Sequence, residues 1–541
     1  MIKKTVLVVV MIVMQIYMIF PFSQAQSQAL EKSVIKYGRL LQLVNSCYVD
    51  TVNLDKLTED AIVGVLSNLD PHSVYISKEE VAKMNEPLVG SFDGIGISFN
   101  ILRDTLLVVT TIPGGPSEKV GLMPGDRIIF VDGKNIAGVN LQNSDVLKML
   151  RGKKGTTVKL KVYRRGGKEL LDFNIIRDKI PINSLDASYM LDDQTGYVKL
   201  NRFSATTVDE FTDALSELYE NPGFKNLILD LRENGGGYLK AAIGVANQFL
   251  KSGKLVVYTQ GVHDSRHDYR SSFRGDFEDG RLIILTDEYS ASASEIVSGA
   301  VQDWDRGLIV GRRSFGKGLV QQPFELNDGS VIRLTTAHYY TPSGRCIQKP
   351  YDDGIAAYNN DYINRFKDGE LFSKDSVHLD KSKSFKTLIS HRTVYAGGGI
   401  MPDIFVPMDT SFHYQYFNLL NHKNIPYSAM LDYLNIHRKQ LQKKYADFES
   451  FKLNYHVGDD LINKIIADGV KEGIKGDEEN VSFAKPLIKR LIKSIMARDL
   501  YEPSCYYQIA NEEDESIKKA ISIIEDKDSY DKYLKGQSPI K

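Results

Sequence analysis

The chain has 541 residues, of which 42% are hydrophobic and 25% charged, and its formal net charge is −1. These fractions exclude a collagen-like or wholly disordered chain, and the length predicts about three domains. The balanced charge argues against a nucleic-acid partner, which would favour a basic face. Cys47, Cys346 and Cys505 lack metal-ligand spacing and disulfide density, so the sequence favours structural roles and selects no disulfide pair.

Residues 1–25 have the features of a signal peptide. Two lysines precede an apolar run over residues 6–20, and Ala25 and Ala29 follow as candidate cleavage positions. An uncleaved anchor is the alternative, because the run approaches the ~17–20 residues that span a bilayer. We therefore expect an exported protein that is periplasmic, or that associates with the membrane through this segment and faces the periplasm.

Apolar residues with helical spacing then form two blocks, and Pro71 follows the second, which predicts a helical region over residues 30–88. Over residues 89–180, short β-like runs alternate with glycine-containing turns such as Asp132-Gly133. This pattern predicts a small, partly open β-barrel with one short helix. The expected strands are Ile95–Phe99, Leu106–Thr110, Arg127–Val131 and Thr157–Tyr163.

Strands alternate with helices over residues 181–407, which predicts an α/β domain. One expected strand, Lys225–Leu231, leads to the glycine run of residues 235–237, and another, Leu282–Thr286, leads to a helix. Within this domain, residues 351–384 are polar and are interpreted as a long, mobile surface insertion. The helical and charged pattern of residues 408–541 predicts a separate C-terminal helical region.

A serine-rich segment, Ser290-Ala291-Ser292-Ala293-Ser294-Glu295, lies between an expected strand and an expected helix. Free backbone N–H groups and the positive end of the helix dipole would stabilise an oxyanion at such a junction. The alternative is a helix N-cap with Glu295 as a first-turn negative charge, and the spacing alone favours that reading.

A lysine between two glycines, Gly316-Lys317-Gly318, favours the catalytic interpretation of the serine segment over the N-cap interpretation. A lysine that acts as a general base must be neutral, so burial must lower its pKa. The glycines allow close backbone approach, and Gln321 is able to hold the amine without adding charge. A phosphate-binding loop is excluded, because Leu319 stands where that motif needs Ser or Thr.

These two motifs resemble the carboxyl-terminal processing peptidases, also called tail-specific proteases. The resemblance covers roughly residues 30–407 and implies a ClpP/crotonase-like peptidase domain behind a PDZ domain, hence an α+β multidomain protein. The other matching segments are Leu69–Ser73, Asp230–Arg232 with the glycine run, Tyr339–Arg345 and Gly398–Asp403. The insertion departs from the family pattern, and residues 408–541 lie outside it.

The resemblance implies specific roles in the peptidase domain. Ser292 matches the nucleophile, Lys317 the general base and Gln321 the residue that orients it. The N–H groups of Ala293 and of a glycine, for which we favour Gly237 over Gly236, match the oxyanion hole. The implied mechanism is acyl-enzyme formation at Ser292 followed by hydrolysis. His72 matches a family histidine that is not catalytic, so we interpret it as structural.

The β-barrel segment resembles a PDZ domain, whose loop N–H groups bind a peptide's terminal carboxylate while the peptide adds as a strand. Arg151 matches an arginine that couples peptide binding to the protease site in some family members, although a solvated surface charge is the simpler interpretation. The expected peptide-binding residues are Phe92, Gly94, Ile95, Gly96, Ile97 and Arg151.

The sequence thus predicts an exported serine endopeptidase that binds protein substrates with apolar C-termini. We expect no cofactor, no metal and no nucleic-acid partner, and a homo-oligomer remains open. The first alternative is a catalytically silent PDZ-containing adaptor of the same fold, which the intact Ser292, Lys317 and Gln321 argue against. The second, a crotonase-like hydratase, does not account for the Ser–Lys pair or the PDZ segment.

Overall fold

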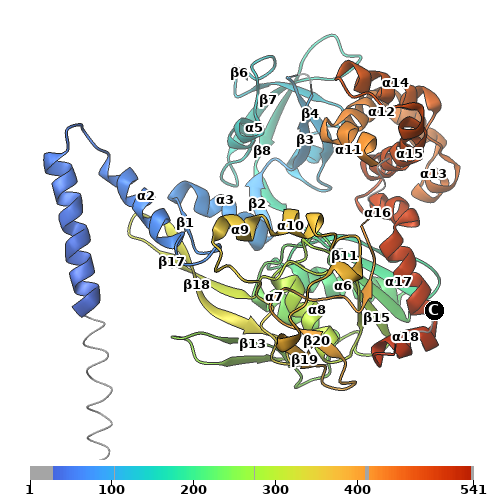
Figure 1. Ribbon diagram of the computed structural model, residues 1–541. Coiled ribbons are helices and arrows are strands. Elements are labelled where there is room, and N and C mark those ends of the chain that lie inside the picture. Colours follow the sequence, from blue (N-terminus) through green and yellow to red (C-terminus); the bar gives the residue numbers. More distant parts are fainter. Residues whose placement is uncertain (1–27, 103, 273, 409–413, 538–541) are drawn as a thin grey trace, which may run out of the picture.

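The computed structural model describes residues 28–537, apart from residues 103, 273 and 409–413 (Figure 1). The predicted signal peptide lies outside the described residues. In the part of the chain that is described, no helix combines the length and the apolarity needed to cross a membrane. Cys47, Cys346 and Cys505 are free thiols.

The N-terminal region contains the predicted helices and a third that the sequence did not predict. A helix over residues 28–47 projects away from the remainder of the molecule (Figure 1, blue). Helix α2 (Leu54–Leu66) ends before Pro71, and the short strand β1 (Val74–Ile76) then joins a sheet of the peptidase part through β18. Helix α3 (Lys78–Val89) follows and contains a proline, Pro87, which obscured it in the sequence.

The β-rich part is entered and left through one antiparallel pair, β2 (Ser91–Gly94) with β9 (Asp178–Pro181). Between them lies a sheet of order β3-β4-β5-β7-β8, in which β6 pairs with β5. Strand β3 is therefore at an edge of the sheet. The further elements are β3 (Ile97–Ile101), β4 (Leu106–Thr111), β5 (Arg127–Val131), β6 (Lys134–Asn135), β7 (Thr157–Tyr163), β8 (Leu171–Ile176), α4 (Pro116–Lys119) and α5 (Asn143–Leu150).

The α/β part is built on a six-stranded sheet of order β10-β11-β12-β15-β16-β21, parallel except for the β10–β11 pair. Alternate residues along β12 face two different cores. One core is formed with α6, α7 and α8. The bounds are β10 (Leu185–Met190), β11 (Thr195–Leu200), β12 (Asn226–Asp230), β15 (Arg281–Thr286), β16 (Leu308–Gly311), β21 (Ile404–Phe405), α6 (Thr207–Tyr219), α7 (Leu239–Asn247) and α8 (Ala293–Asp303).

A second sheet of the α/β part has the order β1-β18-β13-β14, with β17 also paired to β18. Its strands are β13 (Leu255–Gln260), β14 (His267–Arg270), β17 (Leu319–Glu325) and β18 (Val331–Tyr340). The segment predicted as a mobile insertion instead packs on the domain: α9 (Ile355–Asn359) buries Tyr358, and α10 (Asp361–Lys367) buries Arg365. Its polar composition is explained by buried ion pairs, such as that of Arg365 with Glu370.

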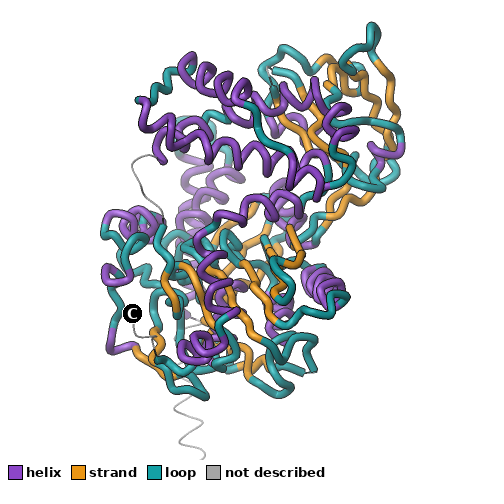
Figure 2. Tube along the Cα trace, turned by 90° about the vertical axis from the view of Figure 1, so that its right-hand side faces the viewer, coloured by secondary structure: helices purple, strands orange, loops and turns teal. Residues whose placement is uncertain are grey.

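The C-terminal region consists of two parts. Helices α11–α15 form a bundle whose core includes Leu102 and Leu107 of the β-rich part (Figure 2). Helices α17 and α18 instead cover the second face of the six-stranded sheet. The bounds are α11 (Tyr414–His422), α12 (Ile425–Lys444), α13 (Phe448–Asn454), α14 (Asp459–Lys471), α15 (Glu478–Leu500), α16 (Ser504–Ala510), α17 (Glu515–Glu525) and α18 (Lys527–Leu534).

Candidate active site

Ser292 lies at the junction of β15 and α8, where it is the N-cap residue, with φ 56° and ψ −111°. A non-glycine residue at such angles costs about 1–3 kcal/mol, and strain of this kind gathers at functional sites. The neighbouring hydroxyls are buried and occupied: Ser290 Oγ donates to the carbonyl of Leu231 at 2.8 Å, and Ser294 Oγ donates to that of Asn234 at 2.8 Å. Of the three serines, Ser292 is the one that remains partly accessible.

Glu295 joins the serine segment to the lysine segment. Its carboxylate is fully buried and accepts from the backbone N–H groups of Ser292 at 2.8 Å and Lys317 at 2.9 Å. It also accepts from Gly316 N at 2.7 Å and Ser314 Oγ at 2.5 Å. Burial raises the pKa of Glu295, against the effect of these hydrogen bonds. The sequence suggested only a helix-capping charge here, because the partners lie about twenty residues away.

Lys317 has the environment that a neutral lysine requires. Burial lowers its pKa from the ordinary value of 10.5, the charge of Arg333 lowers it further, and Glu295 opposes both effects. The amine donates to Gln321 Oε1 at 3.2 Å, and Gln321 Nε2 donates to the carbonyl of His72. No hydrogen bond joins the amine to Ser292 Oγ, although both residues are among those described. Catalytic hydrogen bonds are often long before substrate binds.

His72 therefore contributes its backbone to the site. Its ring Nε2 lies 2.8 Å from the hydroxyl of Tyr358, a residue of the predicted insertion. Burial and the nearby charge of Lys317 lower the pKa of His72 to about 4. The imidazole is thus neutral near pH 7, and its contacts are with Tyr358 rather than with Ser292.

The glycine run approaches the serine segment closely. A Cβ atom on Gly236 would lie 2.8 Å from Ser292 Cβ and 2.9 Å from Ala293 N, so only glycine fits there. Gly236 N donates to Asn234 Oδ1 at 2.9 Å and is therefore occupied. Among the described residues, the N–H groups of Gly237 and Ala293 have no hydrogen-bond acceptor. The N–H groups of Gly237 and Ala293 are therefore free to donate to an oxyanion, whereas that of Gly236 is not, and the oxyanion hole stays a prediction.

Tyr339 is a residue of the candidate site that the sequence analysis did not single out. Its hydroxyl is buried and donates to the carbonyls of both Ser292, at 3.0 Å, and Lys317. Tyr339 thus links the two segments through their carbonyl groups, whereas Glu295 links them through their N–H groups. The position of Tyr339 in the Tyr339–Arg345 segment, which matches the family pattern, was the available signal.

The expected peptide-binding residues surround the edge of β3. Gly96 has φ 73°, and the N–H groups of Ile95 and Gly96 have no acceptor within the described chain. Phe92 and Gly94 lie in β2, and Ile97 begins β3. Arg151 lies over the Phe92 ring, 4.5 Å from its centroid, and forms an ion pair with Glu86 of α3. Arg151 is therefore not a solvated surface charge.

Four family models match the chain: peptidase family S41 over residues 194–357, the PDZ domain over 94–176, the N-terminal domain of the activating protease CtpB over 18–80, and a family of unknown function, DUF8443, over 416–502. The carboxy-terminal processing protease CtpB of Bacillus subtilis is 36% identical over 362 residues, 66% of this chain and 74% of that protein.

Similarity also extends to a second curated protein and to a solved structure. The carboxy-terminal-processing protease of Bartonella bacilliformis is 37% identical over 321 residues, 59% of this chain and 73% of that protein. Among solved structures, the photosystem II D1 C-terminal processing protease is 30% identical and covers 57% of this chain and 88% of its own, with a TM-score of 0.34.

Proposed function

This chain belongs to the carboxy-terminal processing proteases of peptidase family S41, and from that membership we propose that it is an exported endopeptidase that acts on the C-terminal regions of proteins. It is a serine-type peptidase with a PDZ domain. In the proposed mechanism, the PDZ domain binds a protein C-terminus and the dyad of Ser292 and Lys317 cleaves the chain. The observation that carries this assignment is the Glu295 carboxylate, which holds the backbones of both residues.

The chemistry proceeds in two stages. Lys317 in its neutral form, which burial favours by lowering its pKa, takes the proton of Ser292 Oγ as that oxygen attacks the scissile carbonyl. The N–H groups of Gly237 and Ala293 stabilise the oxyanion, and Lys317 then gives the proton to the leaving amine. Water hydrolyses the acyl-enzyme with the same base. Removing a single oxyanion donor typically costs about 100- to 1000-fold in kcat.

The PDZ domain is proposed to recruit substrate through the free edge of β3 and the N–H groups of Ile95 and Gly96. Arg151 connects this site to α3 through Glu86, and α3 is followed by the β2–β9 pair that joins the PDZ domain to the rest of the protein. We therefore propose that the Arg151–Glu86 pair couples peptide binding to the assembly of the dyad. Such coupling requires the peptide to bind the active arrangement more tightly than the resting one.

Location and assembly are also proposals. The residues that carry the predicted signal peptide or anchor precede the helix of residues 28–47. That helix exposes large apolar side chains, including Leu30, Val34 and Ile35, each more than half exposed. Exposed apolar patches of this kind mark association surfaces. We propose an exported homo-oligomer in which these apolar side chains are buried between two copies of the chain.

The test of the proposed function is the loss of hydrolysis in single variants that still fold. We expect Ser292→Ala and Lys317→Ala each to abolish cleavage of an unfolded substrate with an apolar C-terminus, and the double variant to be no worse. Ser290→Ala and Ser294→Ala are matched controls that retain turnover, because those hydroxyls bond to backbone carbonyls. An inactive wild-type protein would favour the adaptor alternative. An active Ser292→Ala variant would indicate a different nucleophile.

A further inference from the structure

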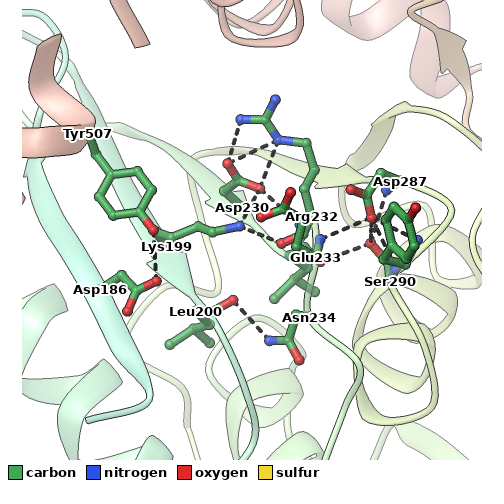
Figure 3. A network of polar contacts seen from close by, with 12 residues as sticks. Asp186, Lys199, Leu200, Asp230, Arg232, Glu233, Asn234, Asp287, Ser290 and Tyr507 are labelled. Atoms are coloured by element: carbon green, nitrogen blue, oxygen red, sulfur yellow. Dashed lines mark hydrogen bonds and ion pairs between the residues drawn. The ribbon is translucent and has the colours of Figure 1, made fainter. Parts of the chain in front are cut away.

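A cluster of buried charges stands at the end of β12, immediately before the glycine loop (Figure 3). Asp230 accepts from Arg232 Nε at 3.0 Å and Arg232 Nη2 at 2.6 Å, and from Lys199 Nζ at 3.4 Å. Its side chain is 1% exposed, that of Lys199 is 7% and that of Arg232 is 18%. Two cations thus share one carboxylate in a site of low solvent access.

The excess positive charge is balanced by a residue from the far end of the chain. Asp514 Oδ2 accepts from Arg232 Nη1 at 2.8 Å. Asp230 accepts from the other two nitrogens of the guanidinium, so Asp514 provides the acceptor for the third. Without Asp514, Arg232 would keep Asp230 as its partner, but Nη1 would lose its acceptor and the guanidinium would be free to turn away from the Asp514 side.

Arg232 begins the loop that carries the proposed oxyanion donor. Arg232 N donates to Asp230 Oδ1 at 2.9 Å, and its carbonyl accepts from Lys199 Nζ. Asn234 then donates through Nδ2 to the carbonyl of Leu200 at 2.9 Å (Figure 3). Its Oδ1 accepts from Gly236 N. The loop from Arg232 to Gly237 is therefore held at its start by the charge cluster, at Gly236 by the side chain of Asn234, and at its end by backbone hydrogen bonds to Phe203.

Asp514 is itself held rigidly. It is the N-cap of α17, where its Oδ1 accepts from Ile517 N at 2.9 Å. The preceding residues are bound to β10: Tyr507 donates to Asp186 Oδ2 at 2.8 Å, and Asn511 Nδ2 donates to the Tyr189 hydroxyl at 2.8 Å. Helix α17 is anchored on the six-stranded sheet by Ile517 and its apolar neighbours.

We infer that the C-terminal region supplies a positioning residue of the peptidase site: Asp514, acting through Arg232, sets the geometry of the loop that presents Gly237 N–H to the oxyanion. The inference rests on the proposed function. It gives residues 503–534 a role in catalysis, although they lie outside the part of the chain that carries the family motifs.

The experiment uses Asp514→Asn in the full chain. Asn is as good an N-cap as Asp, so the variant keeps the cap of α17 through its Oδ1. An amide NH2 group then takes the place of Oδ2, so Arg232 Nη1 loses both the negative charge and the hydrogen-bond acceptor that faced it. Outright removal of an oxyanion donor costs about 100- to 1000-fold in kcat, so we expect a loosened loop to cost less, about tenfold, with KM unchanged. The exposed neighbouring variant Glu513→Gln is the control and keeps wild-type kcat.

A second readout separates positioning from a general structural effect. A peptide aldehyde adds to Ser292 Oγ, and the aldehyde oxygen of the resulting hemiacetal lies where the oxyanion forms. Its inhibition constant should rise by the same factor as kcat falls, while a cleavage-resistant peptide of the same sequence binds equally well. In an Arg232→Lys background, Asp514→Asn should add no further loss, because the two changes act on one contact.

Three results would overturn the inference while leaving the proposed function intact. They are a kcat for Asp514→Asn within twofold of wild type, an equal loss in Glu513→Gln, or a loss of kcat without any change in aldehyde inhibition. The proposed function would fail on a different result, namely cleavage by the Ser292→Ala variant, so the two failures are distinguishable.

Discussion

Replacing Glu295 with Gln tests whether the link between the serine and lysine segments controls the dyad. The glutamine is nearly isosteric, but only one end of its side chain accepts hydrogen bonds. The least costly orientation turns Nε2 toward Ser314, whose hydroxyl is able to accept, and leaves the Gly316 N–H without a partner. An unpaired buried N–H costs about 1–3 kcal/mol, and the remaining bonds weaken when the acceptor loses its charge. We expect the free energy of unfolding to fall by about 2–4 kcal/mol.

The same substitution moves the pH dependence of cleavage in a defined direction. The Glu295 charge raises the pKa of Lys317, so its removal lowers that pKa further. The reactive lysine is the neutral form, and activity therefore rises with pH through the lysine pKa. In Glu295→Gln this rise should begin at lower pH, while the plateau kcat falls because the N–H groups of Ser292 and Lys317 are less firmly held.

The assay is kcat/KM for a short fluorogenic peptide across pH, paired with urea unfolding of each variant. Glu325→Gln is the matched control, because that carboxylate is exposed at the end of β17 and should change neither quantity. A rise in activity that stays at the wild-type pH, or that moves to higher pH, would refute the claim that Glu295 tunes Lys317.

Three further outcomes are expected. First, the ascending limb of the pH profile, which reports Lys317, lies below pH 10.5 and persists in His72→Ala; loss of all activity in a folded His72→Ala protein would instead indicate a histidine base. Second, amidating a substrate's C-terminus weakens its binding to the PDZ domain about tenfold or more, measured by titration calorimetry. Glu86→Gln lowers the turnover of protein substrates but leaves the calorimetric peptide affinity unchanged. If amidated and free-acid substrates are cleaved equally well, the PDZ domain does not read the terminus. Third, Val34→Glu lowers the mass measured by light scattering, whereas an unchanged mass would exclude this helix as the association surface.

The sequence by itself determined those features that depend on short stretches of chain. Strands β5 and β7 begin and end where the alternation of residues placed them, because β7 is exposed and buried at strictly alternating positions. Ser292 and Lys317 were predicted as the dyad because two short motifs, Ser290–Glu295 and Ser314–Gly318, resemble those of the family, and such motifs are read from local sequence. Strand β4 was also recognised, and the structure explains its unbroken apolar run: Leu106 faces the PDZ core, while Leu107 is covered by the C-terminal bundle.

Only the tertiary structure decided how distant segments meet. Glu295, Tyr339 and the His72 carbonyl serve the site through partners that lie far away in the chain, and no local pattern specifies such a convergence. The predicted mobile insertion is another case, since the burial of Tyr358 depends on what packs against it. The role of α17 was likewise not apparent, because an amphipathic helix reveals its apolar face but not the surface that covers it. That surface is the open side of the peptidase sheet, and burying it there brings Asp514 to Arg232.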